Sequence, residues 1–497
     1  MKKTAKILFL IASALFYISA VCSCDLANNS LSIDGSTTAY ENQNIATHVH
    51  SFTEWGVTKL PTCTQRGRKE RACDCGEREV ESLDAVGHLP GSGVVVKMAT
   101  KKEDGIEQTR CSVCNMKLSE EKIPATGSIG LAYAPIGNAN GEKNWIVTGI
   151  GTCQDDDVVI PAVWEGCAVT AIADRAFSGC RGIREITVPS SVTHIGSDVF
   201  LGADSLSKVN YNAPYSDIDN PFLHTPSITE IIFNGVAVPQ NICNSHSNLK
   251  KVTFGESVLT IEKDAFRDCT SLSVLHFSKN LATIEDCAFS GCSALNGINL
   301  PDHLTEIKYG AFEECVSLVS VSIPKNVRVL SNDVFKGCVS LKNITLPEQL
   351  KSIGDYAFAG CQSLVHIDIP ETVISIGNDA FANCASLKKI KIPDGVKEIS
   401  GRTFSGCVSL KEITLGGEIT SIGTLAFYQC ESLGAFTVGE NLASIGNGAF
   451  DGCDSLYEIS FIGTKAQWEF MTKISDRAWS SGSQISIVRC TDGVIYL

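Results

Sequence analysis

The cysteines that could bind a metal or form disulfides lie in two short, degenerate copies of one module, at residues 46–127. The first copy contains Cys73-x-Cys75 and the second contains Cys111-x-x-Cys114. Zinc sites are commonly built from four Cys or His ligands at short spacings. However, Cys73-x-Cys75 is not the usual spacing of a zinc knuckle, and the second copy lacks a set of four ligands. Zinc, unpaired thiols and disulfides all stay open for these cysteines, and disulfides are the commonest staple of small extracytoplasmic domains.

Side chains that could do catalysis are present, but no motif arranges them. The sequence contains no His-Glu-x-x-His, no phosphate-binding G-x-x-x-x-G-K-[ST] loop and no G-x-S-x-G elbow. The nine histidines are scattered, and no pair of acidic residues is fixed by a motif. We therefore predict that the protein is not an enzyme and needs no cofactor. A hydrolase without a recognisable motif is a remote alternative.

The composition describes a folded, acidic chain. Its 497 residues are 44% hydrophobic and 19% charged, so the chain can bury a core and is not a disordered acidic segment. With 41 basic and 55 acidic residues, the formal net charge is −14. A nucleic-acid binder usually needs a basic face, so we do not expect nucleic acid among the partners.

The N-terminus predicts export. Lysines precede an apolar run at residues 7–18, which is the pattern of a secretory signal peptide and is too short for a comfortable membrane span. The Val-Cys-Ser-Cys sequence that follows resembles the lipobox of bacterial lipoproteins, and this implies lipidation of Cys24 or, alternatively, of Cys22. An ordinary secreted protein is the other interpretation. We expect a lipoprotein signal peptide at 1–23 and a polar, flexible tether at 24–45.

Most of the chain is a repeat. The sequence Ala-Phe-x-x-Cys recurs with small variations, and from Phe266 to Phe450 the phenylalanine returns every 23 residues. We call this position the Phe slot. Between Phe200 and Phe266 the register is kept less cleanly, with Phe222 and then Cys243 in the slot. Such regular self-similarity, over about thirteen units, is the signature of a repeat architecture.

Each unit reads L-x-x-I-x-I-P-x-x-V-x-x-I-G-x-x-A-F-x-x-C. The alternating apolar residues of L-x-x-I-x-I predict a short strand, and the proline ends it. The V-x-x-I segment is a second inward-facing stretch, the glycine permits a tight turn, and the phenylalanine closes the coil. One unit cannot bury both apolar rows alone. The predicted fold class is therefore a repeat solenoid, a right-handed β-solenoid with short parallel strands.

This pattern resembles the BspA-type leucine-rich repeat, a 23-residue class found in bacterial and protozoan surface proteins. The resemblance covers about residues 155–463. It implies an N-terminal cap at 128–170, leucine-rich repeats at 171–462 and a C-terminal cap at 463–497. Caps are also a physical requirement, because an open solenoid end would expose apolar rows and unpaired strand edges.

Ten cysteines lie three residues after the Phe slot, and nine of them run without a break. Stacked strands would place neighbours about 5 Å apart at Cα, but their side chains would point in parallel rather than toward each other. We therefore predict a row of buried free thiols, with disulfides or a metal as the alternatives. Cys287 lies off this row. The predicted core ladder is Cys180, Cys269, Cys292, Cys315, Cys338, Cys361, Cys384, Cys407, Cys430 and Cys453.

Two outward-facing stripes are predicted along the strands. The polar stripe, ten residues after the Phe slot, is Thr187, Asn210, Ile232, Thr253, His276, Asn299, Ser322, Thr345, Asp368, Lys391, Thr414, Thr437 and Ser460. The charged stripe, two residues earlier, contains Glu185, Lys208, Glu230, Lys251, Lys389, Glu412 and Glu458. Neither has the aromatic or arginine anchors of a sharp hot spot, so we expect broad or multivalent contact. A merely solvated face is the alternative.

The repeat departs from its pattern at 201–250, where Ala203, Thr225 and His246 stand at the ladder position. An irregular loop with exposed tyrosines suits partner recognition, and simple decay of the repeat is the alternative. From this loop and the outward-facing positions of the strands we take the candidate binding residues Tyr211, Tyr215, Asp217, Asp219, His276, His366, Asp368 and Lys391.

These features together predict an extracytoplasmic, membrane-anchored lipoprotein that is exposed at the cell surface. The family resemblance implies binding or adhesion, with extracellular-matrix or bacterial-surface proteins as partners. The membrane would be contacted through the N-terminal lipid. A passive structural protein of the cell envelope is the alternative.

Overall fold

The computed structural model describes residues 51–137, 143–214, 220–473, 478–480 and 482–497. Outside this part of the chain lie the predicted signal peptide and tether and five of the candidate residues, namely Cys22, Cys24, Tyr215, Asp217 and Asp219. The chain divides into two compact units, Met1–Gly87 and His88–Leu497. Within the described ranges, no helix has the length and apolar character that crossing a membrane requires.

Each small module is a three-stranded antiparallel sheet with its second strand in the middle. The strands are β1 (Gly56–Lys59), β2 (Gly67–Ala72) and β3 (Arg78–Leu83) in the first unit, and β4 (Pro90–Lys97), β5 (Gly105–Cys111) and β6 (Lys117–Ile123) in the second. Most side chains of these strands are exposed or half-exposed. Neither sheet therefore has a deep apolar core of its own.

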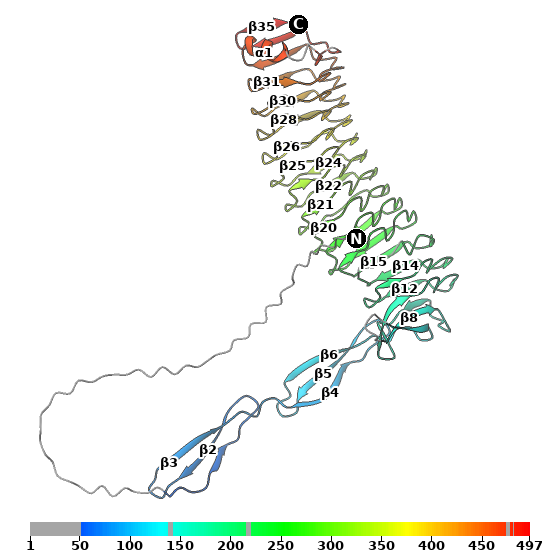
Figure 1. Ribbon diagram of the computed structural model, residues 1–497, viewed down its shortest axis with the longest axis vertical. Helices are drawn as coiled ribbons and strands as arrows, with labels where there is room; N and C mark the ends of the chain where they lie inside the picture. The colour runs from blue at the N-terminus through cyan, green and yellow to red at the C-terminus, as the bar shows by residue number, and fades with distance from the viewer. Residues whose placement is uncertain (1–50, 138–142, 215–219, 474–477, 481) are drawn as a thin grey trace, which may run out of the picture. The chain divides into compact units, whose positions relative to one another are not determined.

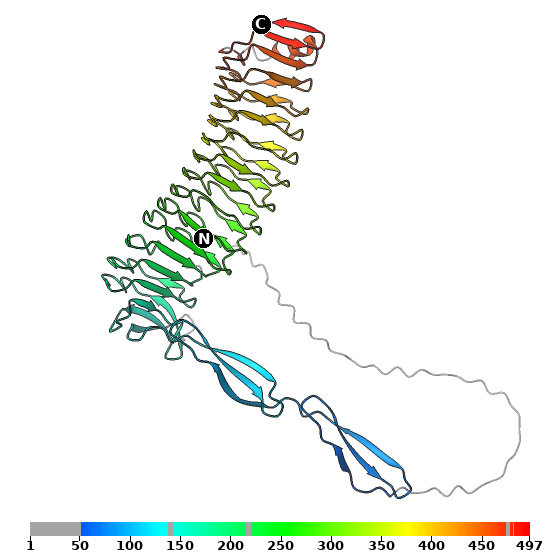
Figure 2. The same ribbon diagram turned by 180° about the vertical axis from the view of Figure 1, so that it is seen from behind.

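The rest of the second unit is a stack of coils with two rows of short parallel strands (Figures 1 and 2). Neighbouring coils pair in register, so that Val209 lies opposite Ile186 on one side and Ile231 on the other. The first row is β12 (Glu185–Val188), β14 (Lys208–Tyr211), β15 (Glu230–Phe233), β17 (Lys251–Phe254), β19 (Val274–His276), β22 (Ser320–Ser322), β24 (Asn343–Thr345), β27 (Lys389–Lys391), β29 (Glu412–Thr414), β31 (Phe436–Gly439) and β33 (Glu458–Ile462). The second row is β13 (His194–Ile195), β16 (Ala237–Val238), β18 (Thr260–Ile261), β20 (Thr283–Ile284), β21 (Glu306–Ile307), β23 (Val329–Leu330), β25 (Ser352–Ile353), β26 (Ser375–Ile376), β28 (Glu398–Ile399), β30 (Ser421–Ile422) and β32 (Ser444–Ile445).

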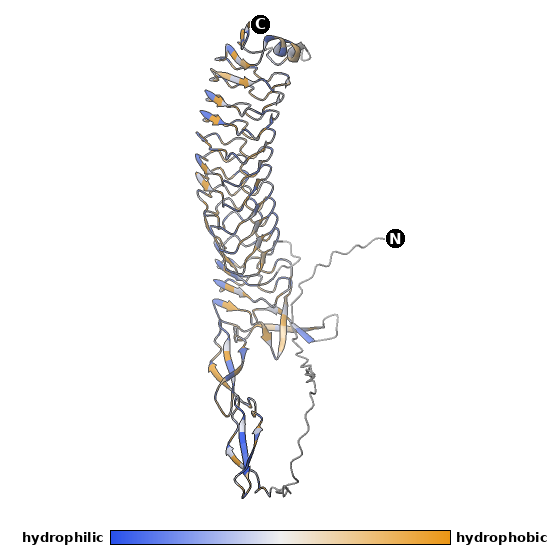
Figure 3. Ribbon diagram, turned by 90° about the vertical axis from the view of Figure 1, so that its left-hand side faces the viewer, coloured by the Kyte–Doolittle hydropathy of each residue, from blue (hydrophilic) through white to orange (hydrophobic). Residues whose placement is uncertain are grey.

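The core of the solenoid is built from the repeating apolar positions and from a column of phenylalanines. From Phe266 to Phe450, neighbouring rings have centroids 5.3–5.9 Å apart and lie within 14° of parallel. The column is interrupted where Cys243 takes the slot, and there Phe233 and Phe254 pack edge-on against Phe266. The repeated unit thus builds the parallel β-solenoid that its sequence predicts, and the strands carry both polar and apolar residues (Figure 3).

Most coils have two left-handed residues, one lying two positions before the Phe slot and one two positions after it, and neither is the glycine that follows V-x-x-I. Tyr356 and Leu425 take the first of these positions with φ of 55° and 56°. The glycine instead lets adjacent coils approach, because a Cβ on Gly377 would lie 2.5 Å from the backbone nitrogen of Asp355. Cys287 also takes the first left-handed position, with φ of 53°, and this explains why it lies off the cysteine row.

Both ends of the solenoid are covered. The N-terminal cap contains β7 (Ala132–Gly137), β8 (Lys143–Gly149), β9 (Asp157–Val159), β10 (Val163–Trp164) and β11 (Cys167–Ile172). The C-terminal cap contains α1 (Lys465–Lys473), β34 (Ile487–Cys490) and β35 (Gly493–Tyr496). Buried Trp479 packs edge-on against Phe450 and also against Trp468, so the last ring of the column is not exposed.

Candidate functional site

The first strand row presents one side of every strand to solvent. In β12, Ile186 and Val188 are buried, whereas Glu185 and Thr187 are half-exposed, and the same alternation recurs in β14, β15 and β17. The residues of the polar and charged stripes therefore share one outward face. This follows from the period of two in a strand, which puts alternate side chains on opposite faces.

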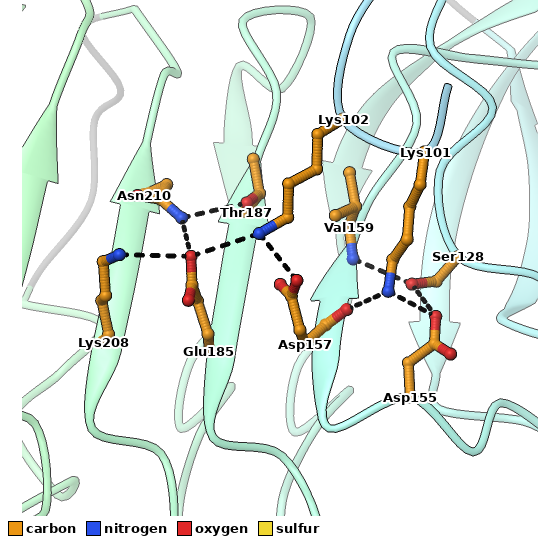
Figure 4. Close-up of polar contacts among 10 residues, drawn as sticks. All are labelled: Lys101, Lys102, Ser128, Asp155, Asp157, Val159, Glu185, Thr187, Lys208 and Asn210. Atoms are coloured by element: carbon orange, nitrogen blue, oxygen red, sulfur yellow. Dashed lines mark hydrogen bonds and ion pairs between the residues drawn. The ribbon is translucent and has the colours of Figure 1, made fainter. Parts of the chain in front are cut away.

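The start of this face is already occupied by the second module (Figure 4). Lys102 Nζ lies 2.6 Å from Asp157 Oδ2 and 3.6 Å from Glu185 Oε1. Glu185 also accepts a hydrogen bond of 2.6 Å from Asn210 and lies 3.5 Å from Lys208. The stripe residues in the first repeats thus hold the chain's own module rather than a free partner.

A second ion pair completes this attachment. Lys101 Nζ lies 2.7 Å from Asp155 Oδ2, and the same carboxylate accepts a hydrogen bond of 2.6 Å from Ser128 Oγ. Buried Ser128 also binds Val159 twice, because its hydroxyl accepts from the Val159 amide at 3.0 Å and its own amide donates to the Val159 carbonyl at 2.7 Å. Hydrogen bonding to Lys101 and Ser128 lowers the pKa of Asp155, so the carboxylate stays charged at neutral pH.

Further along, the outward face is hollowed at one of the places where the first strand row is interrupted. Residues 366–369 form no strand, so that β24 and β27 belong to separate short sheets. The hollow, of about 400 Å³, has buried Ile367 and Ile390 among its walls. Its lining residues are His366, Ile367, Asp368, Ile369, Glu371, Lys389, Ile390, Lys391, Glu412 and Thr414.

The rim of this hollow carries opposite charges close together. His366 Nε2 lies 2.7 Å from Asp368 Oδ1, and Lys391 Nζ pairs with Glu371. The bond to Glu371 raises the pKa of Lys391, which keeps this amine protonated. Three of the predicted binding residues, His366, Asp368 and Lys391, therefore meet at one place. Groups that donate hydrogen bonds and groups that accept them face solvent there side by side.

Two other predicted residues lie elsewhere. His276 is exposed on β19, with its Nδ1 3.4 Å from Thr253 Oγ1. Tyr211 is fully buried and packs against Phe222 and Phe233, so the expectation of an exposed tyrosine there is wrong. It takes the inward position of β14 that Val188 takes in β12, and this repeat register could have predicted its burial.

The cysteine row has a role that the sequence reasoning missed. In nine successive coils the thiol Sγ lies 3.1–3.3 Å from the carbonyl oxygen of the preceding coil's Phe-slot residue. Burial raises the pKa of Cys315 to about 12, so its thiol keeps its proton and can donate. Cys180 differs, since it is half-buried and its Sγ lies 3.9 Å from the Ser178 carbonyl. The signal for this role was Thr225, whose hydroxyl lies 3.4 Å from the Phe200 carbonyl.

The four candidate metal ligands separate into two places. Cys73 is buried in the first unit beside exposed Cys75, and among the described residues neither belongs to a group of three or more metal-ligating side chains. In the second unit, Cys111 and Cys114 lie beside His88, whose Nδ1 is 3.4 Å from Cys114 Sγ.

Comparison with known proteins places the solenoid in a family. The family model described as "BspA type Leucine rich repeat region (6 copies)" matches residues 163–273, 259–387 and 351–486, which together are more than half of the chain. A search of curated protein sequences finds no match.

Several solved structures are similar. A leucine-rich repeat protein from Bacteroides ovatus is 24% identical, with a TM-score of 0.50 over 73% of this chain and 98% of that one. A leucine rich cell surface protein from Faecalibacterium prausnitzii is 26% identical, with a TM-score of 0.39 over 72% and 98%. The pneumococcal vaccine antigen PcpA is 15% identical, with a TM-score of 0.31 over 86% and 97%. The repeat match, together with the observed coils, shows that the chain belongs to the BspA-type leucine-rich repeat family.

Proposed function

We propose that this protein is a surface-anchored binding or adhesion protein whose solenoid contacts proteins of the host matrix or of bacterial surfaces. Its scaffold is of a kind typical of bacterial surface proteins. The observation that carries the proposal is the hollow at residues 366–414, where His366, Asp368 and Lys391 meet on the outward face. A lipid on Cys24 would hold the protein on the membrane.

The face suits a protein partner better than a small molecule. Its polar groups are spread over many coils, and the rim charges of the hollow are exposed, with 48% of the His366 side chain and 92% of Asp368 accessible. A small-molecule site usually surrounds its ligand with apolar walls and a few converging polar groups. An extended polar face instead gains affinity by making many weak contacts at once.

The binding site should lie in the C-terminal half of the face. In the first repeats, Glu185 and Lys208 already contact each other, and Glu185 contacts Lys102 of the second module. A partner would have to displace these bonds to bind there. At the hollow, Lys391 and Glu371 keep 64% and 59% of their side-chain surface accessible, so both can be reached without such a cost.

The test is capture by the full chain of extracellular-matrix proteins and of proteins from bacterial surface extracts, followed by titration of the captured partner. We expect Lys391→Glu to weaken that binding roughly three- to tenfold, because it adds a fourth acidic side chain to a hollow already lined by Asp368, Glu371 and Glu412. Lys279→Glu is the matched control, since Lys279 has a similar exposure and a similar acidic partner, Glu256 at 2.8 Å. A chain that captures nothing would support the alternative of a passive structural protein of the cell envelope. Equal losses of affinity in both variants would place binding away from the hollow.

A further inference from the structure

One end of the second module gathers three metal-ligating side chains. His88 lies two residues before β4, Cys111 ends β5, and Cys114 lies in the turn toward β6. The two strands are antiparallel, with Pro90 opposite Cys111, so the hairpin register brings His88 to the Cys-x-x-Cys turn. The ligand atoms of these three residues lie within 4.8 Å of one another.

The spacing of the ligand atoms suits one small metal ion. A tetrahedral zinc ion with Zn–S of about 2.3 Å and Zn–N of about 2.0 Å holds its sulfur and nitrogen ligands about 3.5 Å apart. Cys114 Sγ and His88 Nδ1 are 3.4 Å apart. The three side chains therefore need only small movements to share an ion.

The turn also favours the form of cysteine that binds metals. Cys111 is buried, and its sulfur accepts a hydrogen bond from the backbone of the turn. The Val113 nitrogen lies 3.5 Å from Cys111 Sγ. A thiolate, not a thiol, is the metal ligand, and a backbone amide that donates to the sulfur stabilises this form.

The module has a structural need for such a cross-link. Val94, Val95 and Val96 of β4 are about half-exposed, and β6 buries none of its side chains fully. Three-stranded sheets of this size lack the buried area to be stable alone and usually need a metal or a disulfide. At the opposite end of the sheet, Lys101 and Lys102 attach the module to the N-terminal cap through Asp155 and Asp157. These two contacts do not reach the end that contains His88, and a metal ion would hold that end together.

We propose that His88, Cys111 and Cys114 bind one structural zinc ion, with the remaining coordination position taken by water or by one more side chain. Two sulfurs and one imidazole nitrogen select zinc over magnesium or calcium, which prefer oxygen ligands. The ladder thiols do not compete for the ion, because they are buried and protonated. This site is independent of the binding face and would stand if the proposed function failed.

The test measures metal in the full chain, purified under reducing conditions, loaded with zinc and dialysed against metal-free buffer. We expect one zinc ion per chain to be retained, and cobalt in its place to give the intense visible bands of a tetrahedral thiolate site. His88→Ala and Cys114→Ser should each lose the ion during dialysis. Cys75→Ser, which removes an exposed cysteine from the other module, is the matched control and should keep it.

A second measurement keeps the proposal testable if the variants fold poorly. Removal of zinc from the unaltered chain by a chelator should speed amide hydrogen exchange in residues 88–127 and leave the solenoid coils unchanged. The proposal is overturned if the loaded chain retains no zinc, or if His88→Ala and Cys114→Ser retain as much as the control. A Cys111–Cys114 disulfide in the exported protein, detected by its mass after alkylation, would overturn it as well.

Discussion

At the scale of the residue, the cysteine row adds a hydrogen bond between neighbouring coils. Each Phe-slot carbonyl of the regular repeats already accepts a backbone amide of its own coil, as Phe335 does from Cys338 at 3.2 Å, and it has room for a second donor. The thiol of the next coil donates to it, as Cys361 does to Phe335 at 3.3 Å. Cysteine fits because it is small and apolar and still carries a weak donor. Thr225 shows that a hydroxyl can take over the same bond.

This arrangement predicts a loss of stability at alkaline pH. Burial raises the pKa of Cys269, Cys315 and Cys407 to about 12, whereas a thiol in the unfolded chain titrates near about 8.5. Above about pH 8.5 the folded chain therefore holds more protons than the unfolded chain, and its stability falls as the pH rises toward 12. Urea midpoints measured from pH 7 to 11 should be constant at first and then fall steeply.

One tyrosine must be separated from the thiols in this experiment. Burial also raises the pKa of Tyr133 to about 12, so this residue changes the stability in the same direction. In Tyr133→Phe the alkaline fall in stability should persist, because the substitution leaves every thiol of the ladder in place. A midpoint that stays constant up to pH 11 in both proteins would contradict the protonated ladder.

At the scale of the element, the sequence predicts the strands and core positions that recur in every unit. It does not predict the features that arise where a unit departs from the repeat. The period of 23 residues is enough to place both strand rows, the phenylalanine column and the outward stripes. The irregular run that begins at Tyr211 favours an exposed loop, whereas the strand register makes Tyr211 an inward residue of β14. The hollow could not be foreseen, because it arises where residues 366–369 fail to pair with their neighbours.

The phenylalanine column makes a second prediction. Phe358 is fully buried between Phe335 and Phe381, with ring centroids 5.9 and 5.4 Å away. Phe358→Ala should lower the free energy of unfolding by about 3–5 kcal/mol, because it removes a large buried side chain and leaves a cavity between two rings. Urea unfolding followed by circular dichroism measures the change.

Two other variants calibrate that loss. Phe358→Leu keeps most of the buried volume and should cost less than about 1.5 kcal/mol. Phe470→Ala removes a phenylalanine that is 73% exposed on α1, so it should change stability by no more than about 0.5 kcal/mol. If Phe358→Ala cost no more than Phe470→Ala, the column would not be a main source of stability.

At the scale of the whole molecule, the described parts of the chain have different roles. The coils present a polar face, and the caps cover the ends of the core with Trp479 and the last strands. The second module is attached to the first coils through Lys101 and Lys102, and so the free part of the face lies further along the chain. Such a scaffold binds usefully only if it is held where partners are found.

The predicted N-terminal lipid anchor therefore also needs a test. In the bacterial lipobox, the modified cysteine becomes the first residue of the mature chain, and Cys24 fits that place better than Cys22. Cys24→Ser should move the protein from the membrane fraction to the medium or the periplasm, since one diacylglyceryl group supplies the apolar surface that holds it. Cys22→Ser is the matched control and should stay in the membrane fraction. Intact mass of the membrane-extracted protein should show a lipid on Cys24, and a mature chain that begins at unmodified Asp25 or Leu26 would exclude the anchor.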